Sequence, residues 1–364
     1  MNKKKIIFIN NHFQQSDGTV RALINLCNAL DKHRYDITIL PLYRLDNRIA
    51  KELEPHIHLK EGLGFYFRGL TRLMRLIPID WLYNRLIGEK YDIEVGFQCD
   101  IPTKLVGYRR KKNILQIAWM HGYENYPQYY CNVDQVVCVS KDNADRCRKE
   151  LPYKANVTFC HNLLNGHLIK QLSKAECNYP TTKGITFITV NRLSPEKGLI
   201  RLVRVFFELK KEGHSFTLLI IGDGKEKKKL QKEISKLHLG KDIFLLGQQN
   251  NPHPYTVRAD VYLCSSYNEG YNTSSIEAAL LGIPIISTQL AGAHEIIDQC
   301  QCGTVCANNN EALKEIIRDI LIHPETITKW KNILKNTKHS FSYEEGKKRV
   351  NYLFDQFLER KSLK

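Results

Sequence analysis

Two glutamates and a run of small polar residues occupy the stretch 265–282, SSYNEGYNTSSIEAALLG. Glu269 precedes Gly270 in a loop, and a glycine lets the backbone approach a ligand closely. Thr273 opens a helical pattern whose free N–H groups and dipole favour a phosphate. Glu277 follows on that helix and can accept hydrogen bonds from vicinal ribose hydroxyls. The stretch therefore predicts a binding site for a nucleotide phosphate.

Ser274 and Glu277 also fit a simpler interpretation. The pattern Ser-x-x-Glu before an apolar run is a capping box, which stabilises a helix N-terminus without any ligand. The residues alone leave both interpretations open.

A second cluster, VNRLSPEKG at 190–198, also lies between a predicted strand and a predicted helix. Arg192 offers a planar fork of donors and Lys197 a point charge. Together they could neutralise a nucleotide diphosphate as it departs from the group it carried. An ordinary basic loop is the alternative.

Three weaker signals follow other predicted strands. Gly222-Asp223-Gly224 ends a strand and is explained by turn chemistry alone. His121 ends a strand in the first half of the chain, where a doubly wound sheet presents side chains to a ligand, although a structural histidine is the alternative. Gly18 and Arg21 lie at the first strand–helix turn and are expected at the same edge.

The elements that must position these residues alternate between strand and helix. Short apolar runs such as Lys5–Asn10, Tyr35–Leu40, Ile185–Val190 and Phe216–Gly222 are separated by amphipathic segments, which predicts parallel sheets covered by helices. A polar segment, Ser173–Gly184, interrupts the alternation and marks a boundary near 175–180. We therefore expect two domains, 1–175 and 180–340, with a ligand cleft between them.

Length and composition agree with a folded, water-soluble protein of two domains. The chain has 364 residues, of which 43% are hydrophobic and 25% charged. No apolar run approaches the roughly 20 residues that span a bilayer, and no secretory signal is evident. Eleven scattered cysteines suit reduced thiols, so we expect a cytoplasmic location and no metal site. The net charge of +16 predicts anionic partners.

These motifs, in this order, resemble the retaining glycosyltransferases of group 1, family 4. The resemblance is most specific from Gly184 to Ala307 and includes Asn-Arg-Leu-Ser-Pro-Glu-Lys-Gly, Gly-Asp-Gly and the two glutamates continued by Gly-Ile-Pro-Ile-Ile-Ser-Thr. It implies an α/β protein with the GT-B fold: two facing Rossmann-like, doubly wound parallel-sheet domains. The C-terminal helix, within 342–364, is expected to cross back to the first domain.

The resemblance also implies roles for individual residues. Glu269 and His121 would be catalytic, lying beside the transferred sugar. Gly18 and Arg21 would belong to an acceptor or phosphate loop, although the family pattern Gly-Gly-x-Glu-Arg reads Asp17-Gly18-Thr19-Val20-Arg21 here. The residues expected to bind the donor are Arg192, Lys197, Gly270, Tyr271, Asn272, Thr273, Ser274 and Glu277.

The expected reaction moves a sugar from a nucleotide diphosphate sugar, UDP-linked by the resemblance, to a saccharide or lipid-linked acceptor in cell-surface polysaccharide biosynthesis. Retention of anomeric configuration is implied by the resemblance. Fixed cations and helix N–H groups can stabilise the leaving diphosphate. Because the sequence has no Asp-x-Asp pair for a divalent cation, we expect neither metal nor cofactor.

The segment 65–81 bears on the acceptor. On a helical wheel Arg68, Arg72 and Arg75 share one face, whereas Leu70, Leu73, Met74 and Ile77 share the other. Such a segment can lie on an anionic membrane, with nearby aromatic residues as interfacial anchors, which would place the protein on the inner face of the plasma membrane. A helix that packs on the core with its arginines in solvent is equally compatible.

Two other classes remain as alternatives. A sugar-nucleotide epimerase of the same architecture would bind the same nucleotide without a second substrate. A nucleic-acid-binding protein would explain the charge, but its basic residues should be concentrated, and here they are spread over both halves. We expect no nucleic-acid partner.

Overall fold

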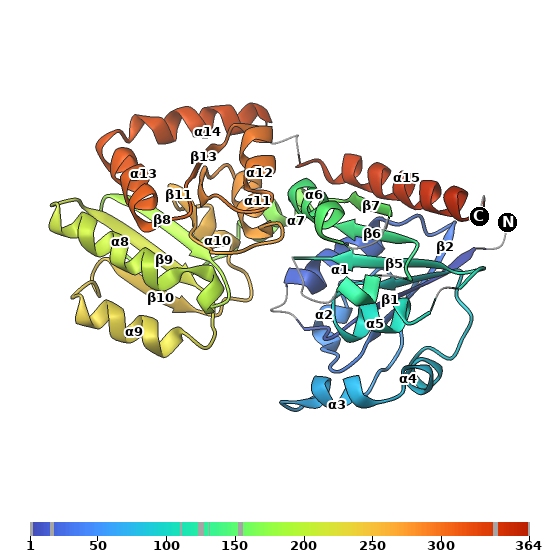
Figure 1. Ribbon diagram of the computed structural model, residues 1–364. Helices are drawn as coiled ribbons and strands as arrows, with labels where there is room; N and C mark the ends of the chain where they lie inside the picture. The colour runs from blue at the N-terminus through green and yellow to red at the C-terminus, as the bar shows by residue number, and fades with distance from the viewer. Residues whose placement is uncertain are drawn as a thin grey trace. The chain divides into compact units, whose positions relative to one another are not determined.

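The computed structural model describes residues 3–14, 18–109, 111–122, 127–130, 132–151, 156–337 and 341–362. The chain forms two compact units, shown in Figure 1. Unit 1 comprises Met1–Leu163 and Tyr343–Lys364, and unit 2 comprises Leu164–Ser342. Each unit is described below by itself.

A seven-stranded parallel sheet forms the centre of unit 1, in the order β3-β2-β1-β4-β5-β6-β7. Helices in the connections make this arrangement possible, because parallel strands need a crossover. The strands are β1 (Lys4–Asn10), β2 (Tyr35–Pro41), β3 (Ile57–Leu59), β4 (Ile93–Gly96), β5 (Leu115–Met120), β6 (Gln135–Cys138) and β7 (Asn156–Phe159). The helices are α1 (Gly18–Ala29), α2 (Asn47–Ala50), α3 (Leu70–Leu76), α4 (Ile79–Leu86), α5 (Ile101–Gly107), α6 (Lys141–Glu150) and α15 (Tyr343–Ser362).

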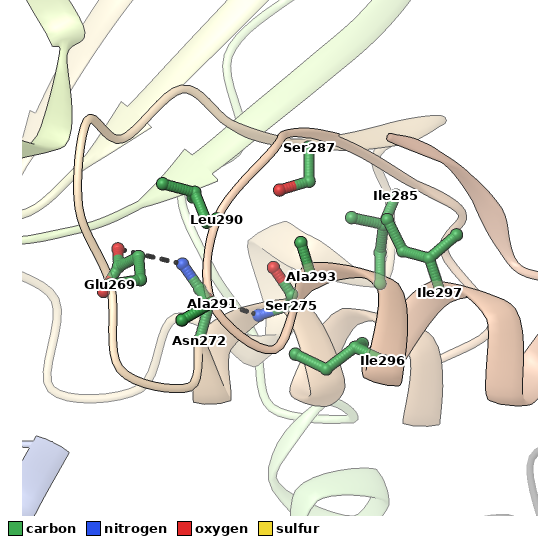
Figure 2. A pocket seen from close by; sticks show the side chains of 10 residues that line it. All are labelled: Glu269, Asn272, Ser275, Ile285, Ser287, Leu290, Ala291, Ala293, Ile296 and Ile297. Carbon is green, nitrogen blue, oxygen red and sulfur yellow. Dashed lines mark hydrogen bonds between the residues drawn. The ribbon is translucent and has the colours of Figure 1, made fainter. Parts of the chain in front are cut away.

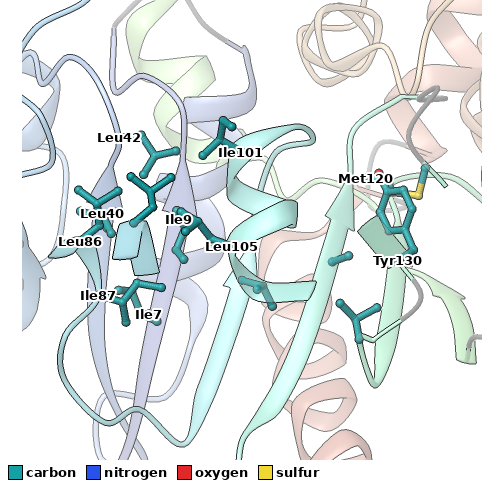
Figure 3. Close-up of a cluster of buried hydrophobic side chains, with 14 of the residues drawn as sticks. Ile7, Ile9, Leu40, Leu42, Leu86, Ile87, Ile101, Leu105, Met120 and Tyr130 are labelled. Carbon is teal, nitrogen blue, oxygen red and sulfur yellow. The ribbon is translucent and has the colours of Figure 1, made fainter. Parts of the chain in front are cut away.

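The sheet of unit 1 is apolar on both faces, as expected for parallel strands covered by helices. Figure 3 shows one face, where Ile7 and Ile9 of β1 pack with Leu40 of β2, Leu86 of α4 and Leu105 of α5. Ile6 and Phe8, which alternate with them on β1, are also fully buried and belong to the other face.

Helix α15 covers that other face, so the end of the chain returns to the first unit as expected (Figure 1). Phe354 is fully buried, and its ring lies 6.4 Å from the ring of Trp119 on β5. Near the end of the helix, Lys361 Nζ donates to Asp134 Oδ2 over 2.7 Å, and the carboxylate is almost completely buried. A buried apolar stripe and an ion pair thus fix this helix to unit 1.

Unit 2 is built on a six-stranded parallel sheet in the order β10-β9-β8-β11-β12-β13. Its strands are β8 (Ile185–Val190), β9 (Phe216–Ile221), β10 (Ile243–Gly247), β11 (Val261–Cys264), β12 (Ile285–Thr288) and β13 (Gly303–Cys306). Its helices are α7 (Gly166–Leu172), α8 (Leu199–Lys211), α9 (Lys227–Lys236), α10 (His253–Thr256), α11 (Thr273–Leu280), α12 (Ala293–Cys300), α13 (Asn310–Ile322) and α14 (Glu325–Thr337).

The strand order of unit 2 reverses between β8 and β11. In open α/β sheets, ligands bind outside the carboxyl ends of the strands at such a point. The segment that follows β8 is 191–198, and the segment that follows β11 is 265–272. The fold therefore brings the two most informative sequence clusters to one edge of one sheet.

The unit boundary lies earlier than the polar break near 175–180. Helix α7 belongs to unit 2, where Gly166 packs against the side chain of Leu280 on α11. The backbone oxygen of Leu172 accepts a hydrogen bond from Asn251 Nδ2 over 2.8 Å. The polar segment is thus a connection within unit 2.

Among the described residues, no helix has the length and apolarity needed to cross a bilayer.

The packing of α15 yields a stability prediction. Replacing Phe354 by Ala removes a fully buried ring and should lower the free energy of unfolding of unit 1 by about 3–5 kcal/mol. Tyr352→Ala, on the same helix at a position that is 64% exposed, should change it by less than about 0.5 kcal/mol. Urea unfolding followed through the fluorescence of Trp119 measures both. Equal losses for the two variants would contradict the described docking of the helix.

Candidate functional site

The carboxylate of Glu269 is the centre of the site in unit 2. Its Oε1 atom accepts hydrogen bonds from Lys197 Nζ over 2.6 Å, from Ser266 Oγ over 2.7 Å and from Asn272 Nδ2 over 3.2 Å. The Lys197 and Glu269 side chains are only 17% and 12% exposed. Lys197 is therefore a nearly buried partner of Glu269 rather than a cation of an ordinary basic loop.

Backbone contacts hold the two loops of the site together. Tyr267 N donates to Glu196 O over 2.7 Å, and Ser265 Oγ donates to Lys197 O over 3.0 Å. Gly198 adopts a left-handed conformation with φ of 64°, and a Cβ at this position would lie 2.2 Å from the backbone oxygen of Ser265. Only glycine permits this approach.

Helix α11 begins differently from the capping-box interpretation. The N-cap is Asn272, whose side chain accepts a hydrogen bond from Ser275 N over 2.9 Å. Ser274 lies inside the helix, so the Ser274-x-x-Glu277 capping box is wrong. Glu277 lies a full turn beyond the helix start, half-buried, where no cap requires a carboxylate. Apart from the Ser275 N–H, which Asn272 binds, the first N–H groups of α11 have no partner within the helix and favour an anion.

The remaining residues expected to bind the donor surround this centre. Gly270 and Tyr271 are buried, whereas Thr273 and Ser274 are half-buried in the first turn of α11. Arg192 is 74% exposed, and its guanidinium lies 3.8 Å from a Glu196 carboxylate oxygen. The structure thus gathers every expected donor-binding residue on the two loops and on α11.

The Gly-Asp-Gly turn packs against the backbone of the loop 191–198. A Cβ at Gly222 would lie 1.8 Å from Asn191 O, and one at Gly224 would lie 2.4 Å from Leu193 O. The backbone of Leu193 also donates to Asp223 O over 2.9 Å. Close packing accounts for both glycines.

A small pocket opens beside Glu269 and Asn272 (Figure 2). Apolar side chains of β12 and α12, including Ile285 and Ile296, form one side of it. Ser275 Oγ is buried in its wall and has no hydrogen-bond partner in the part of the chain that the structure describes. The site therefore combines charged and polar groups with an apolar floor, as ligand sites commonly do.

His121 lies in unit 1, directly after β5. Burial lowers the pKa of its imidazole to about 3, although a hydrogen bond to the backbone of Phe97 opposes the shift. Its Nε2 atom is buried and has no hydrogen-bond partner among the described residues, and the ring packs edge-on against the Phe97 ring at 4.6 Å. His121 is thus neutral near pH 7 and presents a hydrogen-bonding atom rather than a charge.

The edge of unit 1 also holds polar residues that sequence reasoning missed. Asn11 follows β1, and its backbone N–H donates to Gln98 Oε1, beyond β4, over 2.7 Å. The Asn11 Oδ1 atom is buried without a partner. Both residues directly follow predicted strands, where doubly wound sheets bind ligands, and this position in the sequence could have identified them.

Gly18 and Arg21 both lie on α1 rather than in a loop. Arg21 forms an ion pair with Glu52. Asp17, on which the comparison with the family loop also depended, lies outside the described residues.

The helical-wheel prediction for 65–81 is partly wrong. Helix α3 buries Leu70 and Met74, but Leu73 is 51% exposed. Arg75 is not a solvated residue, because its guanidinium makes two hydrogen bonds to the carboxylate of Asp100, at 2.8 and 2.6 Å. The wheel assumed a longer helix than the one that forms. Exposed apolar side chains gather here nevertheless, and we call them the α3–α4 patch: Phe65, Phe67, Leu73, Leu76 and Trp81.

Comparisons with known proteins identify the family that the segment carrying both loops resembles. The model of the family described as "Glycosyl transferases group 1" matches residues 174–337, the segment that carries both loops. The lipopolysaccharide core biosynthesis glycosyltransferase LpsD of Rhizobium meliloti is 25% identical over 282 residues, which cover 77% of this chain and 78% of the relative.

Solved structures extend the likeness to the whole fold. Sucrose-phosphate synthase from Thermosynechococcus elongatus is similar with a TM-score of 0.77 at 16% identity, covering 98% of this chain and all of that one. Anabaena Alr3699/HepE, solved in complex with UDP-glucose, is similar with a TM-score of 0.69 at 16% identity, covering 98% of this chain and 100% of that chain. The two parallel-sheet units and these neighbours show the GT-B fold, and the segment 174–337 of the chain matches the group 1 glycosyl transferases.

Proposed function

We propose that this glycosyltransferase moves a sugar from a UDP-sugar to a saccharide or lipid-linked saccharide acceptor during cell-surface polysaccharide biosynthesis, with retention of anomeric configuration. The observation that carries the proposal is the nearly buried Lys197–Glu269 pair beside the start of α11. This arrangement combines a cation, a carboxylate and free helix N–H groups at the carboxyl edge of a parallel sheet.

The chemistry of the leaving group fits these residues. Cleavage of the bond between sugar and phosphate develops negative charge on the diphosphate and positive character on the anomeric carbon. Arg192 and Lys197 supply fixed cations, and the N-terminus of α11 supplies a dipole. Among the described residues, no cluster of three or more His, Cys, Asp or Glu side chains could hold a metal ion. We propose that the reaction needs no metal, because the cations do its electrostatic work.

The two glutamates take different roles in this proposal. Glu277, half-buried on α11, accepts hydrogen bonds from the ribose hydroxyls. Glu269 lies where its carboxylate can face the transferred sugar, with Lys197 between it and the diphosphate. His121, which lies in unit 1 and offers a neutral ring nitrogen, is the second proposed catalytic residue.

The activities of the relatives support a UDP-sugar as donor and a role in cell-surface polysaccharide biosynthesis. LpsD acts in lipopolysaccharide core biosynthesis, and Alr3699/HepE binds UDP-glucose. A third relative, from Campylobacter jejuni, transfers N-acetylgalactosamine to a diphospho-undecaprenol-linked sugar and is 26% identical over 166 residues. A UDP-sugar donor and a lipid-linked acceptor are therefore the proposed substrates.

A lipid-linked acceptor requires access to a membrane, and the α3–α4 patch suits one. Leu76 is 81% exposed and Trp81 is 58% exposed, on neighbouring helices. Arg68 and Arg72 are exposed between the apolar side chains. Aromatic and apolar groups can enter the interface while each arginine adds about 1 kcal/mol near an anionic surface. We propose that this patch docks on anionic lipid.

The donor site predicts distinct effects for the two glutamates. Glu277→Gln should weaken UDP binding by about 1.5–3 kcal/mol, the usual contribution of a hydrogen bond to a charged group. Glu269→Gln should leave UDP binding nearly intact and lower turnover, because its role is felt in the transition state. Calorimetry with UDP in excess chelator, together with UDP release from UDP-sugars, measures both.

Two results would contradict this account of the donor site. One is UDP binding that disappears in chelator and returns with magnesium or manganese, because the cations would then be insufficient. The other is parent-like UDP affinity and turnover in both variants, because the two glutamates would then have no donor role.

The low pKa of His121 predicts a pH effect with a defined sign. In the unfolded chain this imidazole titrates near 6.5, whereas in the folded chain it titrates at about 3. Its contribution to stability is complete above about pH 6.5 and is lost as the pH falls toward 3. NMR titration, with His121→Gln to assign the signal, should show a neutral ring at pH 5. A ring that protonates near pH 6.5 would refute the assignment.

Membrane docking can be measured by co-sedimentation with vesicles of phosphatidylglycerol and phosphatidylcholine. The parent should sediment with them and not with pure phosphatidylcholine. Replacing Leu76 and Trp81 together by Ser should abolish sedimentation, and replacing Arg68 and Arg72 by Ser should weaken it. Ile322→Ser, at a position of unit 2 that is 53% exposed, is the matched control. Parent-like sedimentation of both double variants would leave the patch as an ordinary surface.

A further inference from the structure

We propose that Arg201, on α8, is a positioning residue that holds the loop of Glu269 in its reactive geometry. The inference rests on the proposed function, because it assigns Glu269 to the transfer reaction. It adds a residue that lies outside both loops and that no sequence motif singled out.

Arg201 is buried to 96%, since only 4% of the residue is exposed. Its Nε and Nη2 atoms both donate to Ser265 O, at 2.9 and 2.5 Å. Nη2 also donates to Ser266 O over 2.9 Å, and a longer contact of 3.4 Å joins it to Thr288 Oγ1. One guanidinium therefore binds two successive carbonyls of the loop and the end of the neighbouring strand.

The charge of Arg201 has no carboxylate partner among the residues that the structure describes. Carbonyl dipoles surround it instead, and the ring of Tyr267 lies 4.1 Å from Cζ. Burial lowers the pKa of this guanidinium, while Tyr267 and two nearby cysteines oppose the shift. Burying a cation in this way is costly unless its hydrogen bonds are satisfied. Here the carbonyl groups of the loop that carries Glu269 accept these hydrogen bonds and offset the cost of burying the cation.

A continuous path of contacts leads from Arg201 to the carboxylate. Arg201 fixes the backbone of Ser266, and Ser266 Oγ donates to Glu269 Oε1 over 2.7 Å. The same guanidinium lies against Gly198, where a Cβ would meet Nε at 2.9 Å. Arg201 thus contacts both loops at the point where they touch and sets the separation of Lys197 from Glu269.

Lysine could not replace it. The acceptors lie in fixed directions that match the planar fork of a guanidinium, whereas an ammonium is a flexible point charge. Arg201→Lys therefore keeps the charge but loses the geometry, and Arg201→Met loses both.

The test compares Arg201→Lys and Arg201→Met with the parent in UDP release from UDP-glucose, UDP-galactose and UDP-N-acetylglucosamine, using the donor that the parent turns over fastest. We expect kcat to fall about 10- to 100-fold, while KM and the Kd for UDP change less than about 3-fold. Arg204→Met is the control, because Arg204 lies on the same helix, is 62% exposed and pairs with Glu233. It should keep the parent kcat.

A double-mutant cycle separates positioning from general stability. If Arg201 acts through Glu269, Arg201→Lys should lower kcat less than about 2-fold in a Glu269→Gln background. A full additional loss in that background, or a parent-like kcat in Arg201→Lys, would overturn the inference. Parent-like turnover in Glu269→Gln alone would instead overturn the role of Glu269 in the proposed function. Arg201→Lys keeps the test valid if Arg201→Met does not fold.

Discussion

The hydrogen bonds from Lys197, Ser266 and Asn272 to one oxygen of Glu269 depend on two loops touching at the backbone level. That contact is possible because residue 198 is glycine, and it is reinforced by the guanidinium of Arg201. An ammonium and a carboxylate that are both nearly removed from water interact more strongly than a surface pair. Separating them without a substitute would be costly, so a diphosphate that recruits Lys197 must supply equivalent charge. A ligand that separates Lys197 from Glu269 must therefore itself carry negative charge.

The rest of unit 2 serves to hold these loops. Strands β8 and β11 are neighbours where the strand order reverses, so their following segments must meet. The glycines of the Gly-Asp-Gly turn let β9 support the first loop, and Asn272 starts α11 directly beside Glu269. Unit 1 repeats the same construction, with Asn11, Gln98 and His121 after its central strands.

Much of this arrangement could be predicted from the sequence, because apolar runs and turn residues report local structure. Both sheets, both loops and the return of α15 are confirmed. Two short edge strands, β3 and β13, were missed because three or four residues carry little periodicity. The Lys197–Glu269 pair, the carbonyl contacts of Arg201 and the pairing of Arg75 with Asp100 join residues that are distant in the chain, so no local pattern reveals them. The cap at Asn272 was missed because Ser274 offered a competing start for the helix.

The most direct test of the account is an experimental structure of the protein with UDP, crystallised in the presence of chelator. The account predicts the ribose hydroxyls on Glu277, the diphosphate at the start of α11, and both Arg192 and Lys197 within hydrogen-bond distance of its oxygens. Ser266 and Asn272 should still hold Glu269. UDP bound elsewhere, or a diphosphate that contacts neither Lys197 nor α11, would contradict it.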